Sequence, residues 1–239
     1  KLSDENPLMQ EYYSKQQALN ASPLVEFMDV IGYKYAYANA LYYQEKEQFL
    51  NSPEFKQYFE DNKSWLVAYS AFCAMRDEFG TSDYTKWGEY AVYSQEKVQQ
   101  YIDSHYDQVA VNYFIQYHLH VQLLEATQYA HQNGIIVKGD IPIGVNRNGV
   151  DTWVNPELFN MDMQAGAPPD MFAIKGQNWE LPTYNWEKME ETGFAWWRDR
   201  FAQMSRYFDT FRVDHILGFF RIWQIPYEQE EGIMGYLNP

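Results

Sequence analysis

The hydrophobic pattern of the 239-residue chain changes at Asn133-Gly134. Before this pair, apolar residues recur with helical spacing, and no long alternating strand pattern occurs. After it, short β-branched runs stand between glycines and prolines, which is typical of strands joined by turns. The sequence therefore predicts two parts: an all-helical subdomain over residues 1–133 and a strand-containing α/β part over residues 134–239.

Local signals mark helix boundaries in the first part. Ser52 precedes Pro53 and Glu54, which predicts an N-cap followed by the first turn of a helix. A further helix is expected to start at Ser64 and to end at Gly80, because glycine readily adopts the left-handed conformation that terminates helices. The Asn-Gly pair that closes this part is a stop signal of the same kind.

The second part shows a strand, loop, helix, strand pattern. The apolar run IIVKGDIPIGV, residues 135–145, favours a strand buried on both faces. A turn-rich region over 144–186, a helix over 190–208 and a second apolar strand over 210–216 follow it. This order predicts a βαβ unit with parallel strands. A connection as long as 144–186 is usually functional, so we expect binding residues within it.

Composition excludes several kinds of partner. The net charge of −15 disfavours nucleic acid, because an acidic surface repels phosphates. No apolar run reaches the length of about 18 residues that a membrane span needs, so no membrane partner is expected. The single cysteine, Cys73, lies in an apolar helical run and predicts a core position in a reduced, cytoplasmic compartment. The oligomeric state is not indicated by the sequence.

The aromatic content of 18% has two interpretations, a tyrosine-rich helical core or surfaces that stack on sugar rings. No metal site is expected, because His118 and His120 are two residues apart and would point to different faces of a helix. The motifs of dinucleotide-binding enzymes, P-loop enzymes, zinc proteases and common serine hydrolases are absent, so no cofactor is predicted.

Three ionisable residues stand close together within the aromatic run FRVDHILGFFRIW, residues 211–223. Strand alternation places Arg212 and Asp214 on the same face, with His215 directly after them. The arginine can keep the carboxylate ionised, and an ionised carboxylate in a cleft can serve as a nucleophile. The alternative is a buried Arg–Asp pair that only sets the register of the strand.

Other candidates lie at strand ends and in the long connection. Asp140 ends the first predicted strand, where polar residues of (β/α) barrels are catalytic; alternatively, it satisfies a turn. Asp151 and Trp153 pair a carboxylate with an indole and could hold a sugar, unless Asp151 is only a loop cap. In the segment over 166–186, a ligand rich in hydroxyl groups could contact four further residues, unless the segment is a generic loop. These are Asp170, Gln177, Asn178 and Trp179.

Five segments occur in a fixed order: GDIPIGV, VDTW, GAPPDMF, GQNW and FRVDHILGFFRIW. Together they resemble the amylomaltase or disproportionating-enzyme family of 4-alpha-glucanotransferases, which are retaining enzymes of the α-amylase clan. The similarity covers most of the chain and is closest to the branch that contains the plant cytosolic disproportionating enzyme. The resemblance implies part of a (β/α)8 TIM barrel with a large all-helical insertion beside it.

The resemblance also implies roles for individual residues. Asp214 matches the catalytic nucleophile of the family, and Arg212 matches its orienting arginine. Asp170 and Phe172 match a mobile loop that gates the substrate, and Trp179 matches an aromatic sugar contact. The full set expected to bind substrate is Asp140, Asp151, Trp153, Asp170, Phe172, Gln177, Trp179 and His215.

The implied reaction transfers α-1,4-linked glucosyl or glucan units from maltose or malto-oligosaccharides to glucan acceptors by double displacement with retention. The alternatives are a hydrolase of the same clan and a noncatalytic glucan-binding module. The general acid of the family, a glutamate on a later strand, has no matching motif around Glu228, Glu230 or Glu231. We therefore expect a fragment that is inactive alone. Two departures are Glu180, where the family usually has glycine, and Met171, where it often has tyrosine.

Overall fold

The computed structural model describes residues 1–238, and its contacts divide the chain into two units. The first unit combines residues 1–74 with 101–119, and the second combines residues 75–100 with the chain from residue 120 onward. Residues 75–100 thus make their contacts with the strand-containing sequence that follows. The domain boundary expected at residue 133 stays a prediction.

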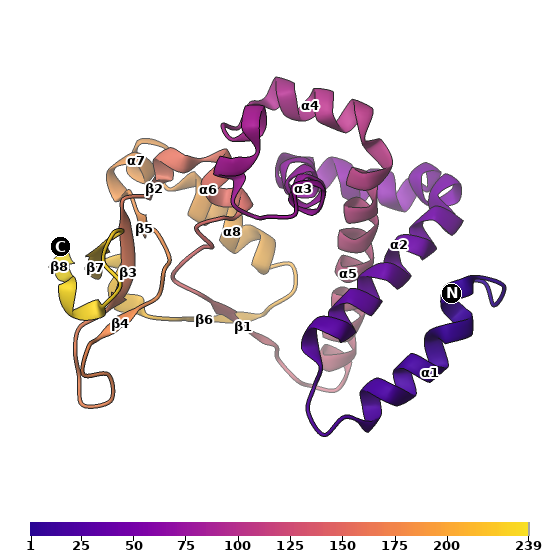
Figure 1. Ribbon diagram of the computed structural model, residues 1–239, viewed down its shortest axis with the longest axis horizontal. Coiled ribbons are helices and arrows are strands. Elements are labelled where there is room, and N and C mark those ends of the chain that lie inside the picture. The colour runs from indigo at the N-terminus through magenta and orange to yellow at the C-terminus, as the bar shows by residue number, and fades with distance from the viewer. Residues whose placement is uncertain (239) are drawn as a thin grey trace. The chain divides into compact units, whose positions relative to one another are not determined.

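Helices dominate the chain up to residue 132, as the hydrophobic spacing predicted. They are α1 (Pro7–Ala21), α2 (Phe27–Asn51), α3 (Pro53–Phe79), α4 (Gln95–Ser104) and α5 (Tyr106–Gln132), with the 3₁₀ turns Tyr84–Lys86 and Gly88–Tyr90 (Figure 1). The predicted stops are confirmed, because Gly80 and Gly134 follow α3 and α5 with φ angles of 66° and 71°.

The start of α3 is predicted correctly, but its continuity is not. Pro53 opens the helix, and the backbone N–H of Phe55 donates to the Ser52 hydroxyl at 3.3 Å. The second start expected at Ser64 is wrong, since α3 runs through this position without a break. No glycine or proline lies between Glu54 and Phe79, and buried residues such as Tyr58 and Leu66 occur on both sides of Ser64, so the helix is not interrupted there.

The first unit has a core rich in tyrosine and phenylalanine. Tyr42 is fully buried and donates its hydroxyl to Asp107 at 2.8 Å. Lys46 pairs with the other oxygen of the same carboxylate at 2.8 Å. The lysine and the tyrosine together lower the pKa of Asp107 by hydrogen bonding. In this unit, therefore, part of the aromatic excess serves helix packing.

The second unit contains three small sheets. Strands β1 (Lys138–Ile141) and β6 (Thr210–Val213) pair in parallel, with Asp140 opposite Arg212. The predicted parallel pairing is thus confirmed. The second sheet pairs β2 (Phe159–Asn160) with β5 (Thr183–Tyr184) in antiparallel orientation. The third sheet is antiparallel and has the order β4 (Gln177–Asn178), β3 (Met163–Ala167), β7 (Ile222–Pro226) and β8 (Tyr236–Asn238) (Figure 1).

Three helices accompany these strands: α6 (Val150–Val154), α7 (Trp186–Glu191) and α8 (Ala195–Met204). The 3₁₀ turns that follow α5 are Pro156–Leu158, Ile216–Phe219 and Gly232–Met234. The single helix expected over 190–208 is therefore wrong. Gly193 and Phe194 both adopt left-handed backbone, with φ of 59° at each, and this separates α7 from α8.

Strand β1 is buried on one face only, so the prediction of a strand buried on both faces is wrong. Gly139 and Ile141 are buried, whereas Lys138 and Asp140 are exposed. The alternation follows from the pleat of the strand, which turns successive side chains to opposite faces. The exposed face carries the charged residues that the apolar run appeared to enclose.

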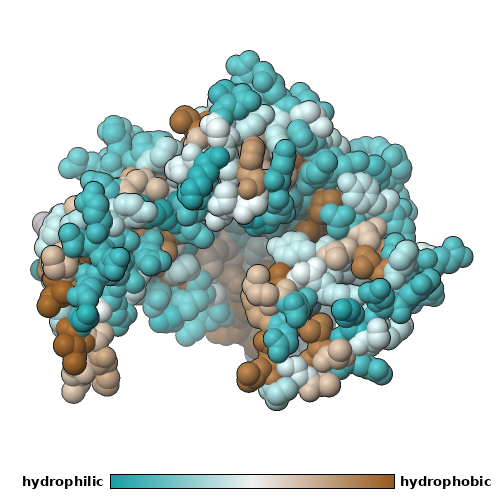
Figure 2. Space-filling view, in the orientation of Figure 1, coloured by the Kyte–Doolittle hydropathy of each residue, from teal (hydrophilic) through white to brown (hydrophobic). Residues whose placement is uncertain are grey.

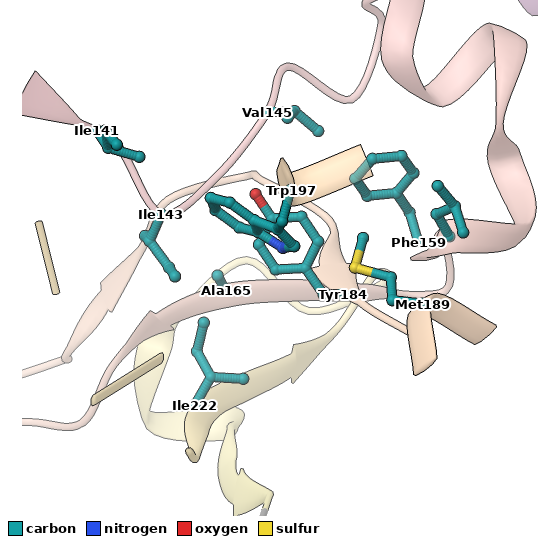
Figure 3. Close-up of a cluster of buried hydrophobic side chains, with 10 residues drawn as sticks. Ile141, Ile143, Val145, Phe159, Ala165, Tyr184, Met189, Trp197 and Ile222 are labelled. Carbon is teal, nitrogen blue, oxygen red and sulfur yellow. The ribbon is translucent and has the colours of Figure 1, made fainter. Parts of the chain in front are cut away.

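A hydrophobic core lies behind this strand pair. Figure 3 shows Trp197 of α8 against Tyr184 of β5, with Ile143, Ala165 and Ile222 around them. Tyr184 and Trp197 are each 5% exposed, and their ring centroids lie 5.2 Å apart. The core thus joins the segment after β1 to two of the other sheets.

The surface is mostly hydrophilic on the face shown in Figure 2, with apolar residues in scattered patches. Three apolar side chains near the tip of one connection are each more than 80% exposed: Met171, Phe172 and Ile174. None of the helices formed by residues 1–238 combines the length and apolar character that crossing a bilayer requires.

Alanine substitutions at two glycines are expected to change the free energy of unfolding in opposite directions. A Cβ atom at Gly166 of β3 would lie 2.1 Å from the Gln177 carbonyl oxygen, whereas a Cβ atom at Gly32 of α2 has no neighbour within 4 Å. Gly166→Ala is therefore expected to lower the free energy of unfolding by about 2–3 kcal/mol through overpacking. Gly32→Ala is expected to raise it by about 0.5–1 kcal/mol, because alanine favours helix. Urea unfolding followed by circular dichroism measures both; equal effects would contradict the packing around β3.

The buried hydroxyl of Tyr184 predicts a loss of stability at alkaline pH. Burial raises the pKa of Tyr184 to about 12, whereas an unfolded tyrosine loses its proton near pH 10. The contribution of this group is therefore complete below about pH 10 and is lost towards pH 12, by roughly 1.4 kcal/mol per pH unit. Urea unfolding at several alkaline pH values should show a shallower decline for Tyr184→Phe than for the unaltered chain. Parallel declines would contradict the assignment.

Candidate functional site

The exposed face of the β1–β6 pair carries a bridged pair of carboxylates. Arg212 donates through Nη1 to Asp140 Oδ2 and through Nη2 to Asp214 Oδ1, each at 2.6 Å. The parallel register explains the geometry, because Asp140 lies opposite Arg212 and the backbone N–H of Asp214 donates to the Ile141 carbonyl at 3.0 Å. Sequence analysis placed Arg212 and Asp214 on one face, and the structure adds Asp140 to them.

All three side chains are about half exposed: Arg212 55%, Asp140 58% and Asp214 49%. This exposure contradicts the alternative of a buried ion pair that only sets strand register. Hydrogen bonding to Asp140, with the charges of both carboxylates, raises the pKa of the Arg212 guanidinium above its usual value. The arginine is therefore a permanent cation that fixes the orientation of both carboxylates.

Two aromatic rings meet beside the Asp214 carboxylate. His215 and Trp179 lie edge to face, with ring centroids 5.0 Å apart. The Trp179 indole N–H also donates to Gln177 Oε1 at 3.0 Å, so three predicted binding residues form one contact group. His215 itself adopts left-handed backbone with a φ of 48°, and this turns the chain sharply directly after the carboxylate.

A cleft of about 420 Å³ opens at this group. Its lining includes Asp214, His215 and Trp179, which the sequence had indicated. It also includes four residues that sequence analysis missed: Pro142, Ile143, Gly144 and Leu181. Their only sequence signal is proximity, because three lie two to four residues after Asp140 and the fourth lies two residues after Trp179.

A β-bulge shapes the aromatic wall of the cleft. The backbone N–H of Trp179 donates to the Ala165 carbonyl at 3.0 Å, and the N–H of Ala165 donates to the Leu181 carbonyl at 2.7 Å. Trp179, Glu180 and Leu181 together face the single residue Ala165, so the bulge has two extra residues, and Glu180 at its centre has a φ of 60°. Its N–H donates to the side-chain oxygen of Asn178 at 2.9 Å. Left-handed backbone costs a residue other than glycine about 1–2 kcal/mol, which explains why glycine suits this position.

Asp151 and Trp153 do not line the cleft. Trp153 is 2% exposed, and its indole N–H donates to the Tyr90 carbonyl at 2.9 Å. The predicted sugar contact through Trp153 is therefore wrong, because both faces of its ring are packed. Asp151 accepts a hydrogen bond from the Trp196 indole at 3.1 Å, which gives it a partner within the fold.

Asp170 and Phe172 lie on a separate connection between β3 and β4. Asp170 Oδ1 accepts from the backbone N–H groups of Phe172 and Ala173 at 2.8 and 2.7 Å. Phe172 is 90% exposed, and neither residue lines the cleft. Lys175, near the other end of the connection, pairs with Glu231. The turn at the tip is thus formed locally, and the apolar ring is presented to solvent.

The arrangement is chemically suited to a neutral, hydroxyl-rich ligand. A carboxylate such as that of Asp214 can act as an oxygen nucleophile, Arg212 holds this carboxylate in place, and the ring of Trp179 lies at the same cleft. Within residues 1–238, no group of three or more His, Cys, Asp or Glu side chains is placed to hold a metal ion.

Substitutions of two tryptophans distinguish a residue needed for packing from a residue that lines the cleft. Trp153→Phe removes a buried hydrogen bond and leaves a cavity, so we expect the free energy of unfolding to fall by about 1–3 kcal/mol. Trp179→Phe alters a partly exposed ring and should cost less than about 1 kcal/mol. Thermal unfolding of both variants checks the order. A larger loss for Trp179→Phe would contradict the burial of Trp153.

Comparisons with known proteins agree on one family. The sequence profile described as 4-alpha-glucanotransferase, glycoside hydrolase 77, matches residues 2–238. The chain is 47% identical over 218 residues to the 4-alpha-glucanotransferase DPE2 of Oryza sativa subsp. japonica, covering 90% of this chain and 23% of that protein. It is 30% identical over 240 residues to the 4-alpha-glucanotransferase of Aquifex aeolicus, covering 98% of this chain and 49% of that protein.

A solved structure gives the same result for the fold. The amylomaltase from Streptococcus agalactiae, determined in complex with acarbose, superposes with a TM-score of 0.83 at 25% identity. The match covers 97% of this chain and 50% of that one. The chain therefore spans between about a quarter and a half of the length of these relatives.

Proposed function

Because the chain belongs to the glycoside hydrolase 77 family of 4-alpha-glucanotransferases, we propose that it carries the nucleophile of a retaining transglycosylation reaction. In this proposal, glucosyl or glucan units pass from maltose or malto-oligosaccharides to a glucan acceptor. The observation that carries it is the Arg212 bridge, which holds Asp214 at the cleft beside Trp179 and His215.

The proposed reaction has two displacements. Asp214 attacks the anomeric carbon of an α-1,4-linked glucose while the glycosidic bond to the leaving sugar breaks, and a covalent glucosyl–enzyme ester forms. A hydroxyl group of the acceptor sugar then attacks the same carbon and releases the carboxylate, and its proton passes to the second carboxyl group, which has given its own proton to the leaving oxygen. Two inversions retain the α configuration. The aromatic wall of the cleft limits access of water, which favours transfer over hydrolysis.

Arg212 has the role of a positioning residue. Its fork-shaped guanidinium bonds two carboxylates at once, so the reactive oxygen of Asp214 has one orientation relative to the strand pair. Asp140 accepts a hydrogen bond from the other terminal nitrogen of Arg212. In this proposal, its half-exposed carboxylate is also accessible to the substrate.

The general acid is proposed to come from outside this chain. Glu231 is engaged by Lys175, and neither Glu228 nor Glu230 belongs to the described lining of the cleft. The leaving oxygen needs a proton donor, and retaining enzymes place the second carboxylic acid close to the nucleophile. The 239-residue chain alone is therefore expected to be inactive, and the partial coverage of the relatives supports this expectation.

We also propose that β1 and β6 are neighbouring strands of a partial (β/α)8 barrel, and that the helices of residues 1–133 are an insertion in the barrel sequence. The parallel pairing and the similarity to an amylomaltase structure support this arrangement. Asp140 and Asp214 at the carboxyl ends of these strands fit it, since barrel active sites form there. A cytoplasmic location belongs to the same proposal and is supported by the single, buried Cys73.

Replacement of the proposed nucleophile provides the test. In the complete polypeptide, Asp214→Asn should reduce glucose release from maltotriose by roughly 10³-fold or more, because the amide cannot form the glycosyl ester. Arg212→Lys should reduce it by about 10- to 100-fold, since lysine lacks the planar fork that orients two carboxylates. Glu190→Gln, on an exposed part of α7, is the matched control and should leave the rate unchanged.

Product analysis separates the alternatives. Longer glucans together with glucose indicate transfer, whereas shortening of the substrate without longer products indicates a hydrolase. Full activity in Asp214→Asn would overturn the assignment of the nucleophile. Binding of maltoheptaose without turnover by the complete polypeptide would instead support a glucan-binding module.

A further inference from the structure

One residue beside the cleft is not glycine but has a left-handed backbone conformation. Glu180 occupies the left-handed position of the bulge, with a φ of 60°. It lies directly between Trp179 and Leu181, both of which line the cleft together with Asp214, while Glu180 itself is exposed and is not part of the lining. Non-glycine residues in this conformation concentrate at ligand sites, because the strain is tolerated where the side chain has a use.

The side chain of Glu180 gives nothing to the fold. Only its backbone N–H is bonded, to the Asn178 side chain. The carboxylate is exposed, and it has no hydrogen bond or ion pair with any other residue of the described range 1–238. The bulge needs a residue that tolerates positive φ, and the carboxylate contributes nothing to that requirement. The carboxylate is therefore free of contacts within the fold and accessible to a ligand at the cleft.

We infer that Glu180 is a specificity-determining residue that accepts hydrogen bonds from hydroxyl groups of a sugar seated over Trp179. This inference rests on the proposed function and adds to it a polar contact that the aromatic wall lacks. An ionised carboxylate only accepts hydrogen bonds, so it selects ligands with hydroxyl donors and disfavours anionic sugars such as phosphorylated glucans. The adjacent ring supplies stacking, and the carboxylate supplies orientation.

The contact is testable because binding and stability should change in opposite directions. Glu180→Gly removes the carboxylate and relieves the backbone, so it should raise the melting temperature while weakening maltoheptaose binding about five- to tenfold. Glu180→Gln keeps the backbone strain and removes the charge, so it should weaken binding without raising the melting temperature. Calorimetric titration of the complete polypeptide measures affinity. Glu190→Gln is the control for the loss of one exposed negative charge.

A double-mutant cycle with the ligand identifies the partner group. Malto-oligosaccharides that lack single hydroxyl groups are titrated into the unaltered protein and into Glu180→Gln. One deoxygenated position should weaken binding to the unaltered protein several-fold and have little effect on the variant, because both changes remove the same hydrogen bond. A residue that acts only through packing gives additive losses at every position.

The outcomes separate this inference from the proposed function. If the unaltered protein binds maltoheptaose and both Glu180 variants bind it equally well, the inference is overturned and the proposed function stands. Purely additive losses in the cycle also overturn it. If the unaltered protein binds no malto-oligosaccharide, the proposed function fails and this inference fails with it.

Discussion

The bridge from Arg212 to Asp140 and Asp214 is the interaction on which the site depends. Two carboxylates at the ends of adjacent parallel strands repel each other, and a single cation bonded to both offsets this repulsion. Each strand then continues directly into the cleft: β1 leads to Pro142, and β6 leads to His215. The bridge therefore fixes the relative positions of two walls that are distant in sequence.

The third wall comes from the antiparallel sheet and is set by backbone geometry. The bulge opposite Ala165 gives Trp179 and Leu181 a shared partner, and the left-handed residue between them changes the direction of the chain. The ion pairs with Arg212 thus fix the Asp214 carboxylate, whereas an irregularity in strand pairing fixes the aromatic surface beside it. The segment that carries Asp214 and the aromatic surface meet where Trp179 contacts His215.

Local signals predicted much of the fold, and they failed where the deciding partner is distant. Gly80 and Gly134 end helices through their own backbone preference, and the parallel pair follows from the order of the apolar runs. Trp153 is a residue for which local sequence signals gave the wrong role. Its spacing from Asp151 suggested a sugar contact, but its hydrogen-bond partner Tyr90 lies 63 residues away. The left-handed backbone of Glu180 likewise depends on pairing with β3, which no local pattern reports.

The register of β1 with β6 also constrains how the chain acquires its structure. Asp140 and Arg212 are 72 residues apart, so their pairing requires closure of a long intervening loop before any ladder bond compensates the lost entropy. The intervening helices and antiparallel strands have closer partners and can form earlier. We therefore expect the Asp214 carboxylate to become oriented late in folding, after the more local helices and turns between the two strands have formed.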